Sequence, residues 1–212
     1  DWTKAANADH LDNVTPPDMK GAVDLGAIIK WLGDTLPDDA IIANGAGNFS
    51  NWVHRFYPYR DYPTELAPQS GSMGYGVPSG VAAKVTMPDR IVVSFNGDGD
   101  FLMCGQEIAT ARQYDLDMVF VVVNNGTYGT IRMHQEKFYP GRISGTDLVN
   151  PDFAALARAY GLHGETVERT EDFAPAFERA RATGGPSLIE LRIEQDQISP
   201  RATLSGLRAA NS

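Results

Sequence analysis

The chain has 212 residues, of which 42% are hydrophobic, so it can bury one globular core but hardly a second. Its formal net charge is -9 and no run of Lys and Arg forms a basic face, so we expect neither a nucleic acid nor an anionic membrane as partner. The single Cys104 excludes an internal disulfide, and no apolar run approaches the length of a membrane span or signal peptide, which makes a cytoplasmic location the expectation.

The first part of the chain predicts a lead-in followed by a helix and a strand. Residues 1–20 are polar, contain a Pro pair and show no hydrophobic period, so we interpret them as a linker or lead-in. The chain begins at Asp1 rather than Met, and we expect it to be a piece of a longer protein. Apolar residues at helical spacing predict a helix over 23–36, and the run at 40–43 predicts a short buried strand that stops at a glycine-rich turn.

The middle of the chain continues this alternation. A segment at 71–85 carries small residues that let a helix pack closely on a sheet, and a strand at 91–95, a helix at 101–114 and a strand at 118–123 follow. The last of these strands is continuously apolar, which is typical of a strand buried on both faces. The NNG that closes it allows a hairpin, because Asn-Gly favours tight turns, but the sequence TIRMHQEKF beyond it does not alternate and favours a helix.

The last third repeats the scheme and ends in a polar segment. The elements predicted there are a helix near 152–160, a short strand near 165–167, a helix opened by Thr170, a strand at 187–193, and a polar tail at 199–212 for which disorder is expected. Strands that alternate with helical crossovers indicate an α/β fold, with a mostly parallel sheet and helices on both faces. We place this domain at residues 21–198.

Two polar side chains follow neighbouring strands of this predicted sheet. Asp98 comes directly after the strand at 91–95, and Asn125 comes after the next strand, with one crossover helix between them. Consecutive parallel strands end at the same edge of a sheet, and neighbouring strands lie roughly 4.8 Å apart, so both side chains can reach a single ion. A carboxylate, an amide oxygen and a backbone carbonyl suit Mg²⁺ or Ca²⁺, whereas Cys104 inside a helix and the lack of a nearby His pair make a poor zinc site.

The same edge suits a phosphate ligand. Gly97 and Gly99 permit close backbone approach, and helix N-termini at this edge favour an anion, so a diphosphate bridged by Mg²⁺ fits the pattern. Gly-Asp-Gly is also ordinary turn composition, and by itself it favours a plain loop.

The motifs together resemble a known family. GDG followed by NN, with 24 residues between Gly99 and Asn124, is similar to the thiamine diphosphate motif. NGAGN at 44–48, GSMGYGVPSG at 71–80, GDGDF at 97–101 and NNGTYG at 124–129 resemble, in order and spacing, the carboxyl-terminal diphosphate-binding domain of acetolactate synthase-like and benzoylformate decarboxylase-like enzymes.

The resemblance implies roles for individual residues. It implies Asp98 and Asn125 as side-chain Mg²⁺ ligands and the carbonyl of Thr127 as a third ligand. Residues expected to contact the cofactor are Gly47 and Asn48 along the diphosphate, Gly99 and Asp100 through backbone N–H groups, Gly71 through its carbonyl, Met73 beneath the bent cofactor, and Ser72, Tyr128, Gly129 and Thr130 around it. Without the surrounding GSMGYG, core packing would be the favoured interpretation of Met73.

The sequence departs from the family pattern at three places. Asp100 stands where many relatives have Ser, so its side chain would face a diphosphate unfavourably unless it turns away, and NGAGN lacks the Gln-His pair common in acetolactate synthases. His134 aligns with a tryptophan of those enzymes that helps to select the second substrate, which makes His134 a candidate catalytic residue; a solvated surface histidine is the alternative.

The function implied by the resemblance is Mg²⁺-dependent binding of thiamine diphosphate, as one domain of a 2-oxo acid decarboxylase or carboligase. The family uses a glutamate from a separate pyrimidine-binding domain, usually on a partner subunit, and nothing here matches that domain. We therefore expect a homo-oligomeric enzyme of which this chain alone is inactive. The alternatives are the small subunit of a two-chain thiamine diphosphate enzyme and a non-catalytic module that binds Mg²⁺ and a phosphorylated ligand; iron-sulfur versions of the former need more than one cysteine.

Overall fold

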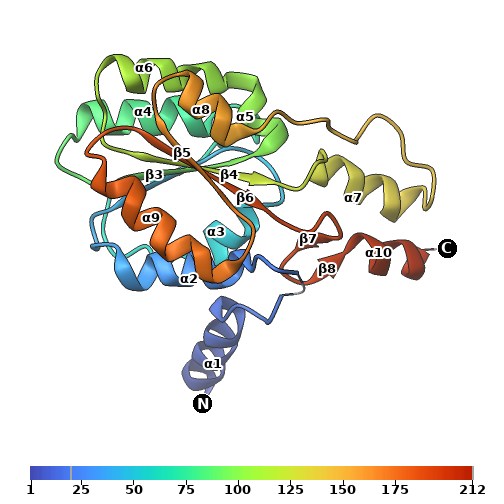
Figure 1. The fold of residues 1–212 in the computed structure, drawn as a ribbon. Helices are drawn as coiled ribbons and strands as arrows, with labels where there is room; N and C mark the ends of the chain where they lie inside the picture. Colours follow the sequence, from blue (N-terminus) through green and yellow to red (C-terminus); the bar gives the residue numbers. More distant parts are fainter. Residues whose placement is uncertain (20, 212) are drawn as a thin grey trace.

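The computed structural model describes residues 1–19 and 21–211 and contains a six-stranded, fully parallel sheet (Figure 1). The strands lie in the order β2-β1-β3-β4-β6-β5. Their bounds are β1 Ile41–Asn44, β2 Glu65–Leu66, β3 Val92–Gly97, β4 Val119–Asn124, β5 His163–Val167 and β6 Ser187–Arg192. The predicted parallel sheet is confirmed, and the short edge strand β2 is one that periodicity did not reveal.

Helices cover both faces of the sheet, as predicted. On one face pack α2 (Leu25–Thr35), α3 (Ser50–Phe56) and α9 (Phe173–Ala182). On the other face pack α4 (Gly76–Thr86), α5 (Asp98–Cys104), α6 (Ile108–Gln113) and α8 (Phe153–Ala159). The short helix α3 was not predicted, and the helix predicted at 101–114 is two helices joined by the 3-10 turn Gly105–Glu107.

Strand β4 shows why the sheet is buried on both faces. Val119, Val121 and Val123 enter the core formed with α2, α3 and α9, whereas Phe120 and Val122 enter the core on the opposite side. All five side chains are at most 2% exposed. A strand that alternates between two apolar cores must be apolar at every position, which is the continuous run that the sequence displays.

Capping residues fix where two of the helices begin. The Asp24 carboxylate accepts a hydrogen bond from the Ala27 N–H at 3.1 Å, and the Asp152 carboxylate accepts one from the Ala155 N–H at 2.7 Å. Each satisfies a backbone donor that has no partner inside the first helical turn. Thr170, which was predicted to open α9, instead begins a 3-10 turn, Thr170–Asp172, and α9 starts after it.

The NNG turn leads into a helix and not into a hairpin. Helix α7, Gly129–Phe138, begins after a short loop that follows β4 and projects from the carboxyl edge of the sheet (Figure 1). The segment at 71–75, which the sequence placed in a helix, is a loop in which Gly71 and Gly74 have positive φ values of 68° and 88°. Such angles suit glycine and end helical geometry, so α4 starts only at Gly76.

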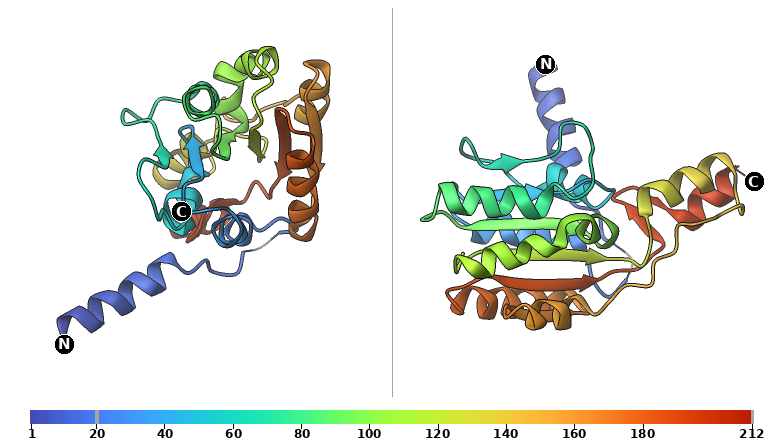
Figure 2. Two further views of the ribbon diagram at one scale, coloured as in Figure 1. Left: turned by 90° about the vertical axis from the view of Figure 1, so that its left-hand side faces the viewer. Right: turned by 90° about the horizontal axis from the view of Figure 1, so that it is seen from above.

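Both ends of the chain carry structure that the sequence did not predict. The polar lead-in contains a helix, α1 (Trp2–Val14), which projects away from the sheet and buries none of its residues (Figure 2). The predicted disorder of the tail is wrong for 199–211, where β7 (Gln197–Ser199) and β8 (Ala202–Thr203) pair and α10 (Leu204–Asn211) packs on α7. Lys20, at the predicted domain boundary, and Ser212 lie outside the described residues.

The topology leaves a crevice at the carboxyl edge of the sheet. After β1 the chain passes to α3 on one face, and after β3 it passes to α5 on the other. In open α/β sheets ligands bind at such a reversal, outside the carboxyl ends of the strands. Among the described helices, none has both the length and the apolar character needed to cross a bilayer.

Candidate functional site

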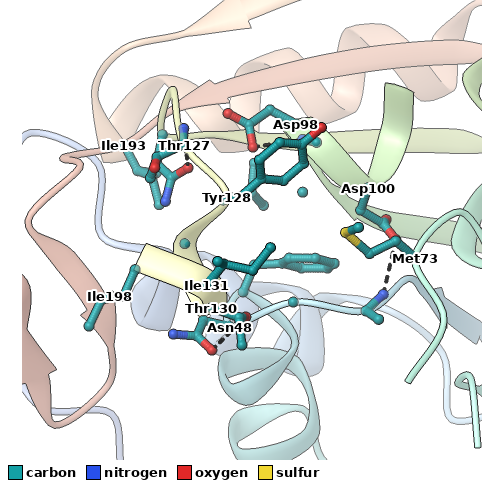
Figure 3. Close-up of a pocket in the computed structure, with 18 of the residues that line it drawn as sticks. Asn48, Met73, Asp98, Asp100, Thr127, Tyr128, Thr130, Ile131, Ile193 and Ile198 are labelled. Atoms are coloured by element: carbon teal, nitrogen blue, oxygen red, sulfur yellow. Dashed lines mark hydrogen bonds between the residues drawn. The ribbon is translucent and has the colours of Figure 1, made fainter. Parts of the chain in front are cut away.

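A pocket lies at this edge, between the loops that follow β1, β3 and β4 and the first turn of α7 (Figure 3). Most of the residues predicted to bind a cofactor line it. They are Gly47, Asn48, Met73, Asp98, Gly99, Asp100, Asn125, Thr127, Tyr128, Gly129 and Thr130. The structure therefore brings together residues from four separate motifs, as the parallel sheet predicts.

Asp98 is the buried acidic group next to the end of β4. Its Oδ1 accepts a hydrogen bond from the Gly99 N–H at 2.8 Å, and its Oδ2 accepts bonds from the Gly126 N–H at 2.8 Å and the Asn150 Nδ2 at 2.7 Å. Burial raises the pKa of this carboxyl, and these hydrogen bonds oppose the shift. Within the described residues no Lys, Arg or His forms an ion pair with Asp98, so its charge is solvated only by neutral donors.

Asn125 and Thr127 lie in the loop that follows β4. Register pairs Gly97 of β3 with Val123 of β4, so Asp98 and this loop meet at the same edge. The Asn125 Oδ1 accepts a hydrogen bond from the Thr127 N–H at 3.2 Å, which turns this amide oxygen inward over the loop.

A short antiparallel contact holds the backbone of this loop. The Tyr128 N–H donates to the Thr146 carbonyl at 2.9 Å and the Leu148 N–H donates to the Gly126 carbonyl at 2.9 Å, on either side of the bridge between Thr127 and Asp147. Thr127 is thus the non-hydrogen-bonded member of the ladder, and its own carbonyl points away from residues 146–148. This leaves the carbonyl available to a ligand in the pocket.

The Asp100 side chain turns away from the space where a diphosphate was predicted. Its Oδ1 accepts hydrogen bonds from the Ala46 N–H at 3.0 Å and the Gly74 N–H at 2.7 Å, so the carboxylate joins the loop after β1 to the loop before α4. A Cβ on Gly45 would lie 1.9 Å from the Asp100 Oδ2, which explains the glycine there. Burial raises the pKa of Asp100 to about 6, against the hydrogen bonds from these backbone groups.

One of the two backbone N–H groups predicted to bind a diphosphate donates to another partner. The Gly99 N–H donates to Asp98, and its missing side chain makes room for the Tyr128 ring, which would lie 2.5 Å from a Cβ at this position. The Asp100 N–H lies in the first turn of α5, where backbone N–H groups have no partner within the helix. The Asn48 Oδ1 accepts a hydrogen bond from the Thr130 hydroxyl at 2.9 Å, which ties the loop after β1 to α7.

Three predicted site residues do not line the pocket. Gly71 and Ser72 lie in the exposed loop before α4, next to Met73, which does reach the pocket and is 40% exposed. His134 is exposed on α7, and its ring stacks on Phe138 with centroids 5.9 Å apart and planes 2° apart. Cofactor contacts of Gly71 and Ser72 and a catalytic role of His134 therefore stay predictions.

Sequence reasoning missed the apolar part of the lining. Ile131, Ile193 and Ile198 line the pocket (Figure 3), and so do Phe49 and Trp52. Ile131 could have been predicted, because it is next to the predicted site residue Thr130 in the first turn of α7. Ile198 could not be found in this way, because it lies on a three-residue strand at the border of the predicted polar tail, where no periodicity marks a strand.

The arrangement defines a class of protein: an α/β domain that holds a cofactor outside the carboxyl ends of its parallel strands, next to buried acidic groups. Comparison with known families gives the particular family. The family described as thiamine pyrophosphate enzyme, C-terminal TPP binding domain, matches residues 45–191, and thiamine pyrophosphate is another name for thiamine diphosphate. The chain belongs to this family.

The relatives include acetolactate synthases. Acetolactate synthase from Schizosaccharomyces pombe is 35% identical over 164 residues, which are 76% of this chain and 24% of that protein. The large subunit of acetolactate synthase isozyme 2 from Escherichia coli is 32% identical over 171 residues, which are 79% of this chain and 31% of that protein. The chain thus spans less than a third of the length of these relatives.

A solved structure shares the fold. Thiamine diphosphate-dependent 4-hydroxybenzoylformate decarboxylase from Rhodococcus jostii superimposes with a TM-score of 0.79 at 32% sequence identity, over 86% of this chain and 34% of that one. The α/β fold and the membership of an acetolactate synthase-like domain family therefore have independent support in sequence and in structure.

Proposed function

We propose that this chain binds thiamine diphosphate through Mg²⁺, as the C-terminal domain of a 2-oxo acid decarboxylase or carboligase. The observation that carries the proposal is the environment of Asp98. A carboxylate that is 3% exposed and has only neutral donors around it is expensive to keep ionised, and a divalent cation supplies the missing positive charge.

The residues present fit this ion. Asp98 and Asn125 offer side-chain oxygens and Thr127 offers a carbonyl directed away from its ladder, all on the same pocket. Hard oxygen ligands of this kind suit Mg²⁺, which keeps its remaining positions for water and phosphate oxygens. Among the described residues no three His, Cys, Asp or Glu side chains cluster as a metal site, and the set of one carboxylate, one amide and one carbonyl does not require such a cluster.

The pocket also suits the organic part of the cofactor. When bound, thiamine diphosphate supplies the carbanion stabilisation that cleavage next to the carbonyl of a 2-oxo acid requires. The chain's own contribution is to hold the diphosphate along Gly47 and Asn48, to place Met73 beside the rings, and to exclude water with Ile131 and Ile198.

We further propose that activity needs a pyrimidine-binding domain or subunit that lies outside this chain, in a homo-oligomer. The support is that the chain spans less than a third of its relatives. The face of α7 that presents His134 and Phe138 is exposed in this chain, and we propose that it meets the substrate or the covering domain in the assembled enzyme.

Calorimetry tests the cofactor proposal directly. Thiamine diphosphate is titrated into the 212-residue chain with Mg²⁺ and, separately, with excess EDTA. We expect binding only with the metal. Equal affinity in EDTA would rule out the metal bridge, and no binding under either condition would rule out this chain as a self-sufficient cofactor module.

Activity of the isolated chain tests the second part. The purified chain, saturated with cofactor and Mg²⁺, should neither decarboxylate a series of 2-oxo acids nor exchange the reactive proton of the cofactor faster than the cofactor free in solution. Steady turnover by this chain alone would contradict the proposed need for a further domain.

A further inference from the structure

A chain of partly buried hydrogen bonds leads from Asp98 across the sheet edge to β6. The Asn150 Nδ2 donates to the Asp98 Oδ2 at 2.7 Å and to the Asn124 Oδ1 at 2.9 Å. The Asn124 Nδ2 donates in turn to the Glu190 Oε1 at 2.7 Å. These residues come from the start of α5, the end of β4, the segment before α8 and the middle of β6, so four parts of the sequence meet in a single network.

Glu190 sets the direction of this network. Its carboxylate is fully buried and receives hydrogen bonds from the Thr166 hydroxyl at 3.2 Å and the Arg192 Nε at 3.3 Å. An ionised carboxylate only accepts hydrogen bonds, so the amide of Asn124 must turn its Nδ2 toward Glu190. The Asn124 Oδ1 then faces the opposite way, where the Gly126 N–H also donates to it at 3.1 Å.

The orientation of Asn150 follows from that of Asn124. Because the Asn124 Oδ1 is an acceptor, Asn150 must present its Nδ2, and the two hydrogens of this group serve Asn124 and Asp98. A flipped Asn150 would place its oxygen against both the Asn124 oxygen and the Asp98 carboxylate. Two acceptors in contact repel each other, so the network permits a single orientation.

We propose that Asn150 is a positioning residue of the Mg²⁺ site, which fixes the Asp98 carboxylate and is itself oriented by Glu190 through Asn124. The inference rests on the proposed function for the identity of the ion. It adds that metal affinity depends on residues that do not touch the metal, one of them on a strand two positions away from β3 in the sheet. Partners of this kind around a metal ligand typically change affinity by about 10–100-fold when they are removed.

The test measures Mg²⁺ dependence and thiamine diphosphate dependence separately, by calorimetry on the full 212-residue chain. At saturating cofactor, Asn150→Ala should raise the Mg²⁺ concentration needed for half-saturation by about tenfold or more. Excess Mg²⁺ should restore binding to the wild-type stoichiometry, because the cofactor contacts themselves remain. Glu190→Gln keeps the buried volume but can present a donor to Asn124, and should raise the Mg²⁺ requirement by about threefold.

A double variant tests whether Glu190 acts through the network. The Asn150→Ala, Glu190→Gln double variant should raise the Mg²⁺ requirement by less than the product of the fold-changes of the two single variants. Effects that multiply would show that the two residues act independently and would overturn the proposal. If Asn150→Ala does not fold, Glu190→Gln alone decides, and an unchanged Mg²⁺ requirement in that variant would overturn it.

Ser187→Ala is the matched control for lost stability. Ser187 lies on the same strand, and its hydroxyl donates a buried hydrogen bond to the Ala180 carbonyl at 3.0 Å, away from the network. This variant should lower the melting temperature and leave the Mg²⁺ requirement unchanged. Wild-type chain that binds no cofactor would refute the proposed function, whereas wild-type and Asn150→Ala chains with the same Mg²⁺ requirement would refute only the role of Asn150.

Discussion

Two regions of the chain surround their buried carboxylates with opposite kinds of partner. At the junction of α7 and α10, the fully buried Glu136 is paired with Arg208 and lies 3.8 Å from the Arg132 Nε. At the carboxyl edge of the sheet, Asp98 and Asp100 are equally well buried but have only backbone and amide donors.

The pKa values follow this difference. The Arg208 hydrogen bond lowers the pKa of Glu136 to about 2, whereas burial raises the pKa of Asp100 to about 6 and also raises that of Asp98. The Asp100 carboxylate is held by backbone N–H groups of the two loops that it joins, whereas Asp98 lies at the position that we propose for the cation. The contrast therefore separates a carboxylate paired with an arginine from a carboxylate that we propose is kept for a ligand.

The largest expected effect is on Asp98. Asp98→Asn keeps the shape of the side chain but removes its charge, so Mg²⁺-dependent binding of thiamine diphosphate should weaken by roughly 100-fold or more. The cofactor-free variant should stay folded with no gain in melting temperature, because the removed charge is offset by an amide N–H that faces one of the donors from Gly99, Gly126 and Asn150. Calorimetry and thermal melting measure the two quantities. Asp34→Asn, in a surface pair with Lys30, is the control; an Asp98→Asn chain with wild-type Mg²⁺-dependent affinity would break the contrast with Glu136.

The next effect is the pH dependence of the cofactor-free chain. With a folded-state pKa of about 6 against an ordinary value of 3.8, Asp100 binds its proton more tightly in the folded state. Its contribution to stability therefore rises as pH falls from about 6 toward 4, by on the order of 2–3 kcal/mol. Urea unfolding of wild type and Asp100→Asn at pH 7 and pH 4.5 measures it. Between pH 7 and pH 4.5 the free energy of unfolding of wild type should rise relative to that of Asp100→Asn. The same change in both proteins would contradict this prediction.

A smaller effect of the opposite sign is expected at Glu136. Its lowered pKa means that its charged form stabilises the folded chain above about pH 4.5, and that this stability is lost as pH falls toward 2. Glu136→Gln should lower the melting temperature at pH 7 by roughly 2–6 °C. Glu171→Gln, which breaks an exposed pair with Arg169, should change it little. If the two variants melt alike, the buried pair does not stabilise the protein.

The smallest effect is expected for His134. Because His134 is exposed and does not line the pocket, His134→Ala should change cofactor affinity of this chain by less than about twofold. In the assembled enzyme the same change should alter the product ratios across a set of 2-oxo acids and aldehydes, if α7 faces the substrate there. Unchanged ratios and rates would place His134 on the solvent side of the helix.

The sequence was sufficient for five of the six strands of the sheet and for the groups that follow β3 and β4. Continuous apolar runs predicted β3 and β4, and the geometry of parallel strands then predicted that Asp98 lies near Asn125. The glycine motifs added the loops after β1 and before α4. These parts could be predicted because each depends on local pattern and on one rule of chain topology.

The remaining features depend on contacts between distant segments. Asn150 reaches Asp98 across 52 residues, from a loop with no periodicity, and no local signal marks it. Helix α1 could not be predicted from periodicity, because it has no apolar stripe and buries none of its residues. Helix α10 is short, and the contact with α7 that includes the Glu136–Arg208 pair cannot be seen in the pattern of either segment alone.

The placement of α10 has a consequence for proteolysis and for tagging. A protease that cuts after Thr203 would remove Arg208 and leave the Glu136 carboxylate in an apolar setting with only the Gly141 N–H and Arg132 beside it. Helix α7 would then lose a stabilising contact, and the first turn of this helix carries Thr130 and Ile131, which line the pocket. Removing the last eight or nine residues would thus destabilise a helix that contributes to the pocket. An affinity tag is better attached at the other end of the chain, beside the exposed α1.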